Sequence, residues 1–193
     1  MGQATAVEHD ALTAMRGATR VCSARDVARA LRRMAGEIDA RLAGRIPIVL
    51  AVMHGGVFAA VELCKRFRFP YEFDYVHLTR YANGTRGGAI EWRVRPSENL
   101  AGRTVLVVDD ILDRGDTLRA LHAELKRVGV AVQHTAVLVA KRVPGRHRRP
   151  KVDFVGVEVD DLYVFGCGMD YRGHWRGLSA LYALDSRHVP GRG

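Results

Sequence analysis

The sequence lacks the features that mark membrane and exported proteins. Its 193 residues contain no apolar run near the roughly 20 residues of a membrane-spanning helix, and the candidates, such as Pro47 to Met53, have the length of a strand. The N-terminal segment 1–15 carries Glu8, His9 and Asp10 where a secretion signal needs basic residues followed by an apolar stretch. Neither a membrane anchor nor export is therefore expected.

Cysteine is also scarce. The chain has three cysteines, Cys22, Cys64 and Cys167, which is an odd number with no C-x-x-C spacing. This pattern indicates neither a disulfide framework nor a thiolate zinc site, so a cytoplasmic location is expected. Cys64 and Cys167 have no evident basic partner that would activate a thiol, and we expect them to be packing residues.

Charge is the one compositional bias. The chain has 30 Lys and Arg against 21 Asp and Glu, a formal net charge of +9, while 48% of its residues are hydrophobic, as in a folded domain. Six of the eleven residues from Lys141 to Lys151 are Lys or Arg. Such a run can bind nucleic-acid phosphates, attract a small polyphosphate or form solvated surface, and composition leaves these alternatives open.

Short apolar runs alternate with helical patterns along the chain. Ser23 begins a capping box with Asp26, followed by apolar residues at helical spacing, and Gly44 is placed to end that helix. Glycine and polar residues from 81 to 89 predict a mobile loop, whereas residues 1–20 and 186–193 have no interpretable pattern. The predicted strands cover 47–53, 73–78, 91–95, 104–110 and 135–141, and two further helices cover 57–67 and 117–129.

This alternation predicts an α/β fold with a largely parallel sheet covered by helices on both faces. Ligands of such sheets bind beyond the carboxyl ends of the strands. The turns that follow Met53, Asp109 and Lys141 are therefore the places where we expect a site.

The segment VLVVDDILDRGDTL, residues 105–118, carries the most chemical information. Asp109 and Asp110 end a buried strand, and residues 113–117 form a turn into a helix, whose exposed N–H groups attract anions. Acids beside an anion site are explained if the ligand also carries a sugar diol or magnesium. A ribose phosphate with Mg²⁺ satisfies both demands, whereas an acid that merely caps the helix explains only one residue of the group.

This segment resembles the phosphoribosyl-pyrophosphate motif of the type I phosphoribosyltransferases: an apolar strand, two acids, two apolar residues, then D-x-G-x-T. From about Ile46 to Leu184, the order of features is similar to that of the hypoxanthine-guanine phosphoribosyltransferases, particularly bacterial ones. The resemblance implies the type I fold, with a mostly parallel twisted sheet, a small hood lobe and a mobile loop. We expect one domain over 1–193, its core at about 46–142 and its hood built from the N-terminal segment and about 150–184.

The resemblance also implies which residues bind phosphoribosyl pyrophosphate. Asp109 and Asp110 would hold the ribose hydroxyls and the associated Mg²⁺, directly or through water. The 5′-phosphate would be wrapped by Asp113, Arg114, Gly115, Asp116 and Thr117. Asp113 would also face N7 of the purine, where a carboxylate can move a proton during catalysis.

Two further loops match the family. In the first, His54 and Gly55 would grip pyrophosphate through the backbone, often with a cis non-proline peptide before the glycine; His54 stands where many relatives have Lys, and is either a ligand contact or a polar loop residue. Arg80 and Tyr81 match the start of a lid that excludes water from the reacting sugar, although an exposed hairpin tip is the simpler interpretation of that loop.

The C-terminal half matches the part of the family that recognises the base. Lys141 would donate to O6 of a 6-oxopurine, Tyr163 would stack on the base and Val164 would offer its backbone to the base edge. Asp170 would bind a second magnesium ion, and Arg176 would hold pyrophosphate. Tyr163 and Trp175 could instead fill the core, which is the expectation for Trp175.

The implied activity is the transfer of a phosphoribosyl group from phosphoribosyl pyrophosphate to N9 of hypoxanthine or guanine, with Mg²⁺ as cofactor. The family usually forms dimers or tetramers, so we expect a homodimer or homotetramer, without membrane or nucleic-acid partners. The alternative is a regulator that senses the sugar phosphate and binds nucleic acid. The basic 141–151 run favours it, whereas the complete set of base-reading residues favours the enzyme.

Overall fold

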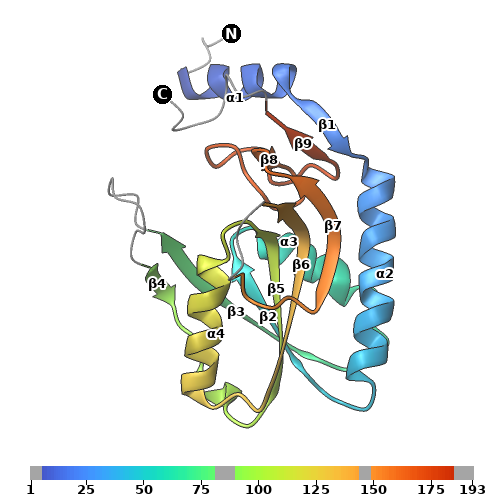
Figure 1. The fold of residues 1–193 in the computed structure, drawn as a ribbon, viewed down its shortest axis with the longest axis vertical. Coiled ribbons are helices and arrows are strands. Elements are labelled where there is room, and N and C mark those ends of the chain that lie inside the picture. The colour runs from blue at the N-terminus through green and yellow to red at the C-terminus, as the bar shows by residue number, and fades with distance from the viewer. Residues whose placement is uncertain (1–5, 81–89, 144–148, 185–193) are drawn as a thin grey trace.

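The computed structural model describes residues 6–80, 90–143 and 149–184. Within these ranges, a six-stranded sheet has the order β4-β3-β2-β5-β6-β7, and a smaller sheet has the order β1-β9-β8 (Figure 1). The elements are α1 (Ala6–Gly17), β1 (Thr19–Cys22), α2 (Ala24–Leu42), β2 (Ile48–Met53), α3 (Gly56–Cys64), β3 (Glu72–Arg80), β4 (Ile90–Val94), the 3-10 helix η1 (Glu98–Leu100), β5 (Thr104–Leu112), α4 (Asp116–Val128), β6 (Val132–Arg142), β7 (Phe154–Asp160), β8 (Val164–Phe165) and β9 (Leu181–Ala183).

The large sheet is mostly parallel, as the sequence predicted. Strands β2, β3, β5, β6 and β7 run parallel, and β4 alone is antiparallel, paired with β3 at one edge. The central strands are continuous apolar runs because helices cover both of their faces. Their carboxyl ends therefore lie at the same end of the sheet, together with the predicted site residues Asp109, Asp110 and Lys141.

Helices pack on both faces of this sheet. Residues of α2 and α3 join alternate residues of β2 and β5, such as Val49 and Leu106, in one buried cluster. The intervening residues, such as Leu50 and Val107, face α4 in a second cluster. In Figure 1, α2 and α4 lie on opposite sides of the sheet. Because neighbouring strand residues point to opposite faces, each central strand stabilises both layers.

Local sequence signals explain α2 well. The Ser23 hydroxyl caps the helix by accepting a bond from the Asp26 N–H at 3.2 Å, as the capping box predicted. All the periodic apolar residues expected there are buried: Val27, Leu31, Met34, Ile38 and Leu42. The helix ends at Leu42, just before the Gly44 expected to terminate it.

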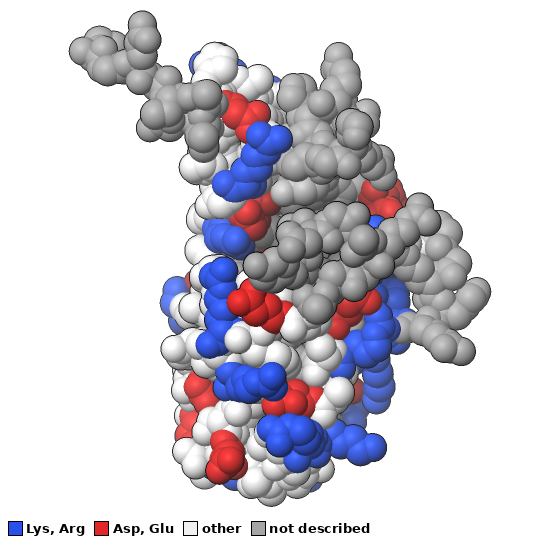
Figure 2. Space-filling view, turned by 90° about the vertical axis from the view of Figure 1, so that its left-hand side faces the viewer, with Lys and Arg blue, Asp and Glu red and all other residues white. Residues whose placement is uncertain are grey.

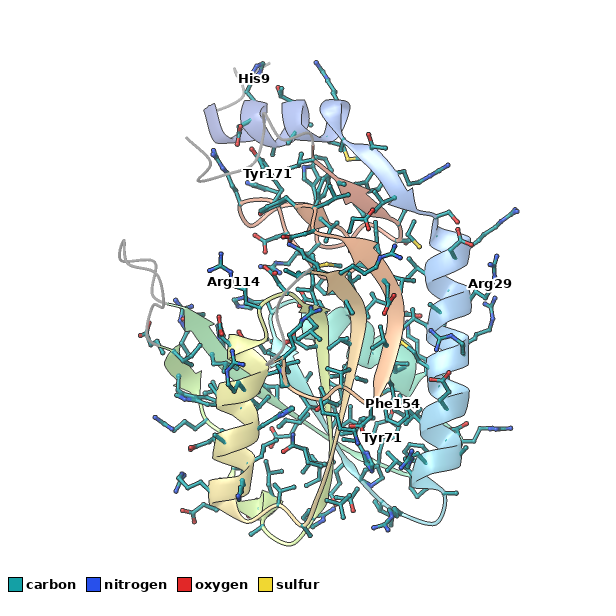
Figure 3. All side chains as sticks on the ribbon, in the orientation of Figure 1. His9, Arg29, Tyr71, Arg114, Phe154 and Tyr171 are labelled. Atoms are coloured by element: carbon teal, nitrogen blue, oxygen red, sulfur yellow. The ribbon has the colours of Figure 1, made fainter. Side chains whose placement is uncertain are left out.

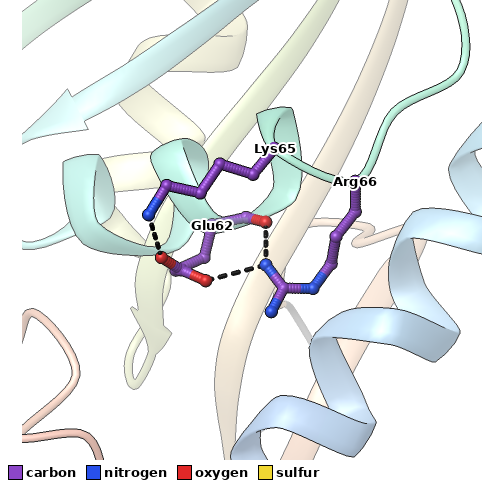
Figure 4. Close-up of polar contacts among 3 residues, drawn as sticks. All are labelled: Glu62, Lys65 and Arg66. Carbon is purple, nitrogen blue, oxygen red and sulfur yellow. Dashed lines mark hydrogen bonds and ion pairs between the residues drawn. The ribbon is translucent and has the colours of Figure 1, made fainter.

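Helix α3 is shorter than the 57–67 helix that we predicted, because it ends at Cys64. Glu62 near its end binds two cations, Lys65 Nζ at 2.7 Å and Arg66 Nη1 at 2.7 Å (Figure 4). These bonds hold the pKa of Glu62 below its ordinary value. Beyond the helix, Phe67 stacks on Phe69 with ring centroids 4.8 Å apart, which turns the chain toward β3.

The small sheet and α1 form the hood, whose N-terminal part had no interpretable pattern in the sequence. Tyr171 is buried against α1, and its hydroxyl donates to Asp10 Oδ2 at 3.0 Å. Trp175 Nε1 donates to the carbonyl of Ala11 at 2.9 Å, and its ring packs in the hood cluster, as expected for a core residue. Contacts between residues more than 150 positions apart have no local signal, which explains why the pattern of residues 1–20 did not reveal α1.

The expected boundary between core and hood is wrong at β7. We expected Phe154–Asp160 within the hood, but this strand pairs in parallel with β6 and is the edge strand of the six-stranded sheet. Its buried residues, including Phe154 and Val159, belong to the cluster that also contains α2.

Among the described residues, no helix is long and apolar enough to cross a bilayer.

A prediction about stability follows from the contact between α2 and β7. A β-carbon on Gly156 would lie 2.4 Å from the carbonyl oxygen of Leu138 and 3.0 Å from Met34 Sδ. We expect Gly156→Ala to lower the free energy of unfolding by roughly 1–3 kcal/mol, measured by urea denaturation. The control is Gly36→Ala in α2, where nothing lies within 4 Å, and which should raise stability by about 1 kcal/mol. Equal effects of the two substitutions would contradict the packing argument.

Candidate active site

A cavity of about 310 Å³ lies at the carboxyl ends of β2 and β5 and at the start of α4. Its lining combines the loop after β2, the acids of β5, the turn before α4 and one arginine of the hood. Two of the three turns expected to form a site, those after Met53 and Asp109, therefore converge here. The lining residues are Val52, Met53, His54, Gly55, Leu78, Asp109, Asp110, Ile111, Asp113, Arg114, Gly115, Thr117, Leu118 and Arg176.

Two neighbouring acids occupy the floor of this cavity. Asp109 is 6% exposed, and its Oδ1 accepts a hydrogen bond from the Asp110 N–H at 2.9 Å. Burial raises the pKa of Asp109 well above its ordinary value, and the adjacent Asp110 raises that pKa further. Burial also raises the pKa of Asp110, while the nearby Arg176 acts in the opposite direction. The floor therefore has a strong demand for cations or hydrogen-bond donors.

The loop after β2 closes tightly over these acids. The Met53–His54 peptide is cis, in agreement with the family pattern. A β-carbon on Gly55 would lie 1.6 Å from Asp110 Oδ2, and one on Gly168 would lie 2.2 Å from the Gly55 carbonyl oxygen. Gly55 meets the Asp110 carboxylate of β5 on one side and the Gly168 backbone of the hood on the other, so the loop presents main-chain groups to the cavity.

The start of α4 forms the opposite wall. Gly115 caps the helix, and Asp113, Arg114, Gly115 and Thr117 all line the cavity. Figure 3 shows Arg114 above α4, on the hood side of the large sheet. Asp116 does not line the cavity, because its carboxylate is turned to Arg119 in an ion pair. The first turn of a helix offers N–H groups and a positive dipole end to an anion.

Lys141, near the end of β6, contacts this wall through Asp113. Its ammonium lies 3.6 Å from Asp113 Oδ2 and 3.6 Å from Asp161 Oδ1, and its side chain is 12% exposed. The lysine is therefore held between two carboxylates rather than extended into the basic run that follows. The structure thus brings Lys141 of β6 together with Asp113 of the turn that follows β5.

The hood contributes a linked set of polar groups. The Tyr163 hydroxyl donates to the carbonyl of Asp170 at 3.1 Å, and the Asp170 carboxylate pairs with Arg176 at 2.7 Å. Arg176 also donates to the Gly168 carbonyl at 2.7 Å. Val164 is buried in β8 and pairs with Ala183. Arg176 lines the cavity, whereas Tyr163, Val164 and Asp170 do not.

His54 has an aromatic neighbour that sequence reasoning missed. The rings of His54 and His77 meet edge to face with centroids 4.4 Å apart, and β2 and β3 pair at Met53 and His77. His77 Nε2 is buried without a hydrogen-bond partner among the described residues. Burial, followed by the nearby His54, lowers the pKa of His77. Only the pairing of the two strands could reveal this contact.

Two other missed residues lie behind the site. Asp161 shares Lys141 with Asp113, and Arg149 donates to the carbonyls of Leu112 and Lys141. Neither has a sequence signal, since Asp161 is one of two adjacent acids and Arg149 is one basic residue within the 141–151 run. Of the remaining predicted residues, Arg80 is the last residue of β3, and its side chain lies outside the described residues, as do Tyr81, the 81–89 loop and residues 144–148.

The rest of the described structure offers less chemistry. An apolar groove of about 530 Å³ lies between α2 and α3, away from the converging acids. Cys167, which also lines it, is a free thiol whose pKa is raised to about 12 by burial, as expected for a packing residue. Among the described residues, no three His, Cys, Asp or Glu side chains form a ready-made metal site.

Comparison with known proteins identifies this arrangement. The family model described as the phosphoribosyl transferase domain matches residues 18–172. The chain belongs to the phosphoribosyltransferase family. The match covers both the β5–α4 turn and the hood residues up to Tyr171, so it includes the whole set of converging elements except Arg176.

Two of the named relatives of this phosphoribosyltransferase are named for hypoxanthine and guanine. A hypoxanthine-guanine phosphoribosyltransferase of Bacillus subtilis is 29% identical over 163 residues, which are 84% of this chain and 90% of the relative. A hypoxanthine-guanine-xanthine phosphoribosyltransferase of Tritrichomonas foetus is 28% identical over 82% of this chain and 87% of its own length. A bifunctional TilS/HprT protein of Listeria innocua is 30% identical over 80% of this chain, which spans only 24% of that longer protein.

Solved structures show the same fold. A hypoxanthine phosphoribosyltransferase of Staphylococcus aureus aligns with a TM-score of 0.79 at 22% identity, covering 96% of this chain and 98% of the other. A hypoxanthine-guanine phosphoribosyltransferase of Bacillus anthracis aligns with a TM-score of 0.76 at 22% identity, covering 86% and 96%. The type I phosphoribosyltransferase fold expected from the sequence is confirmed.

The buried acids give a prediction about pH. Because burial raises the pKa of Asp109, the folded protein binds a proton at this carboxyl more tightly than the unfolded chain does. The stability that comes from this bound proton is fully present below the pKa of the unfolded state. It is lost as pH rises through the pKa of the folded state. Asparagine at this position stays neutral, so Asp109→Asn does not lose this stability as pH rises. We expect the variant, without metal, to exceed the wild type by more than about 1 kcal/mol near pH 8, and the difference to vanish near pH 4.

Urea denaturation in the presence of a chelator measures this difference at each pH. The matched control is Asp160→Asn, because Asp160 is 77% exposed and pairs with Arg142 at 3.4 Å, a kind of surface pair that contributes little. Its stability should follow that of the wild type at every pH. If Asp109→Asn also followed the wild type, the buried carboxylate would not carry the pH dependence.

Proposed function

We propose that this phosphoribosyltransferase acts in purine salvage. It transfers the 5-phosphoribosyl group from phosphoribosyl pyrophosphate to N9 of hypoxanthine or guanine, and releases IMP or GMP together with pyrophosphate. The named relatives act on these bases by name, and the regulator that binds nucleic acid has no support among them. On the face of the molecule in Figure 2, Lys and Arg are interspersed with Asp and Glu rather than gathered in one basic patch.

The approach of Lys141 to Asp113 carries this proposal. Asp113 belongs to the turn that starts α4, which suits a phosphate, while Lys141 is the second-last residue of the neighbouring strand β6. A purine whose O6 and N7 edge faces this pair would present O6 to the ammonium and N7 to the carboxylate. An ammonium has donors only, so it prefers the carbonyl of a 6-oxopurine to the amino group of adenine.

The remaining residues of the site each bind a different part of the substrate. The Asp109 and Asp110 carboxylates accept bonds from the ribose hydroxyls, and residues 113–117 wrap the 5′-phosphate, with Asp116 contributing through its backbone. His54 and Gly55 hold pyrophosphate with Arg176, whose positive charge stabilises the leaving group as the sugar becomes cationic. Asp113 takes or gives a proton at N7, which tunes the nucleophilicity of N9.

Base recognition falls to the hood and to β6. Tyr163 stacks on the purine, which contributes about 1–3 kcal/mol, and its bond to the Asp170 carbonyl holds it in place. Val164 and the Asp170 backbone contact the base edge. We further propose that Arg80 and Tyr81 begin a lid that keeps water from the reacting sugar.

Magnesium fits the acids of this site. Asp109 and Asp110 are adjacent carboxylates whose charge is penalised by burial, and Mg²⁺ typically takes one or two carboxylates and completes its shell with water and substrate phosphates. Asp109 and Asp110 would hold one ion and Asp170 a second, directly or through water. When bound, the metal neutralises charge on the phosphate oxygens.

The assembly and location remain proposals. A homodimer or homotetramer is supported by exposed apolar side chains on α3 and at the β3 end of the sheet, where Phe73 and Tyr75 are 46% and 45% exposed. One self-complementary surface of this kind is enough for a dimer. The single-domain organisation and the cytoplasmic location stay predictions.

Steady-state rates on a panel of free purines test the proposed function. With phosphoribosyl pyrophosphate and Mg²⁺, hypoxanthine and guanine should each yield a nucleotide, whereas adenine should not, because it lacks the carbonyl that Lys141 requires. Chromatography of the products measures this outcome, and rates for xanthine extend the panel. Protein that binds phosphoribosyl pyrophosphate but makes no nucleotide from any oxopurine would instead favour the regulator.

Asp113→Asn tests the proton-transfer role. We expect turnover to fall by roughly 10²- to 10⁴-fold with little change in the affinity for GMP, because the amide keeps the shape of the carboxylate but cannot take the proton. The control is Asp161→Asn, which removes the other carboxylate on Lys141 and should leave most of the turnover. Equal losses of turnover and nucleotide affinity in Asp113→Asn would rule out the assignment.

A further inference from the structure

Arg149 lies behind the active site, where it bridges two strand ends. Its Nη1 donates to the carbonyl of Lys141 at 2.6 Å, and its Nη2 donates to the carbonyl of Leu112. The pairing of β5 with β6 ends at Leu112 and Ala140, so these carbonyls lie where the ladder between the two strands stops. Buried carbonyls need donors from elsewhere at such a point, and one guanidinium supplies both.

The surroundings hold Arg149 in this position. The residue is partly buried, and its Nε is fully buried without a partner among the described residues. The adjacent Pro150 packs on the turn before α4, since a β-carbon on Gly115 would lie only 2.4 Å from Pro150 Cδ. Residues 149 and 150 therefore touch both the end of β6 and the turn that starts α4.

The two bridged carbonyls adjoin the residues on which the proposed function rests. Leu112 directly precedes Asp113, and the second carbonyl belongs to Lys141 itself. The Asp113 carboxylate and the Lys141 ammonium lie 3.6 Å apart. The β5–β6 register of the described residues ends at Leu112 and Ala140, so it includes neither residue of this pair. We propose that Arg149 is a positioning residue that sets this separation, and so aligns the purine with the 5′-phosphate loop.

Arginine suits this role better than lysine. Its planar guanidinium offers two donors with a fixed spacing, so it can hold two carbonyls at once, whereas an ammonium is a point charge on a flexible chain. If Arg149 sets the separation, the charge alone is not enough. Arg149→Lys keeps the charge but lacks the two fixed donors, so it should not replace Arg149. A free guanidinium ion has both donors, so it should replace the lost side chain in part.

The chain offers a matched control in Arg33. Its Nη2 also donates to two backbone carbonyls, those of Val155 at 2.7 Å and Gly156 at 2.6 Å. Both of these carbonyls belong to one strand, β7, and neither Arg33 nor its partners line the cavity. Substitution of Arg33 therefore removes the same kind of contact, together with the surface ion pair between Arg33 Nη1 and Glu37 at 2.8 Å, without touching the ends of β5 and β6.

The experiment compares Arg149→Gln, Arg149→Lys and Arg149→Ala with the same three substitutions of Arg33. We expect each Arg149 variant to lower kcat by roughly 10- to 100-fold and to raise KM for hypoxanthine, while KM for phosphoribosyl pyrophosphate changes little. The melting temperature should fall by similar amounts in the two series. Millimolar guanidinium chloride should restore part of the turnover of Arg149→Ala and none in Arg33→Ala, which should retain its activity throughout.

A crystal structure of Arg149→Gln completes the test. It should show a changed separation between Asp113 and Lys141, and an unchanged separation would overturn the inference whatever the activity. The inference also fails if kcat and KM for hypoxanthine move no more in the Arg149 series than in the Arg33 series. If the wild type makes no nucleotide from any purine, it is the proposed function that fails, and the crystal structure still decides the geometry.

Discussion

The backbone around the cavity is packed so closely that side chains are excluded from two of its contacts. A β-carbon on Gly55 would overlap the Asp110 carboxylate, and one on Gly168 would overlap the Gly55 carbonyl. The loop after β2 is therefore wedged between the end of β5 and the hood. The loop therefore contacts β5 through the Asp110 carboxylate and the hood through the Gly168 backbone. The site depends on this wedge, since it brings main-chain groups to the acids.

Two arginines also hold the backbone in place around the site. Arg176 donates to the Gly168 carbonyl and pairs with Asp170, which fixes the hood turn beside the acids. Arg149 donates to the carbonyls at the ends of β5 and β6. Parallel strands diverge at their carboxyl ends to admit a ligand, and carbonyls released there must find other donors. In this phosphoribosyltransferase, those donors also determine where the functional side chains point.

Local signals predicted the elements whose stability comes mostly from their own residues. The cap and apolar stripe of α2, the buried runs of β2 and β5, and the glycine turn before α4 all appear as expected. The motif of 105–118 was enough to predict that Asp109, Asp110 and Asp113 share one cavity, because its chemistry is concentrated in a few consecutive residues. Prediction failed for β7, which was expected in the hood, and for α1, whose residues had no interpretable pattern. There Phe154 and Tyr171 are buried by segments that are distant in the sequence.

The sequence by itself determined the class of fold, the acidic and glycine-rich motifs and the kind of ligand that they suit. Only the tertiary structure decided that Lys141 lies 3.6 Å from both Asp113 and Asp161, that His54 meets His77, and that one arginine of a basic run turns inward to hold two strand ends. The physical reason is that motifs record chemistry along the chain, whereas distances between strands depend on sheet order and packing. The positive charge that suggested a nucleic-acid partner therefore includes Lys141 and Arg149, residues held by bonds within the protein.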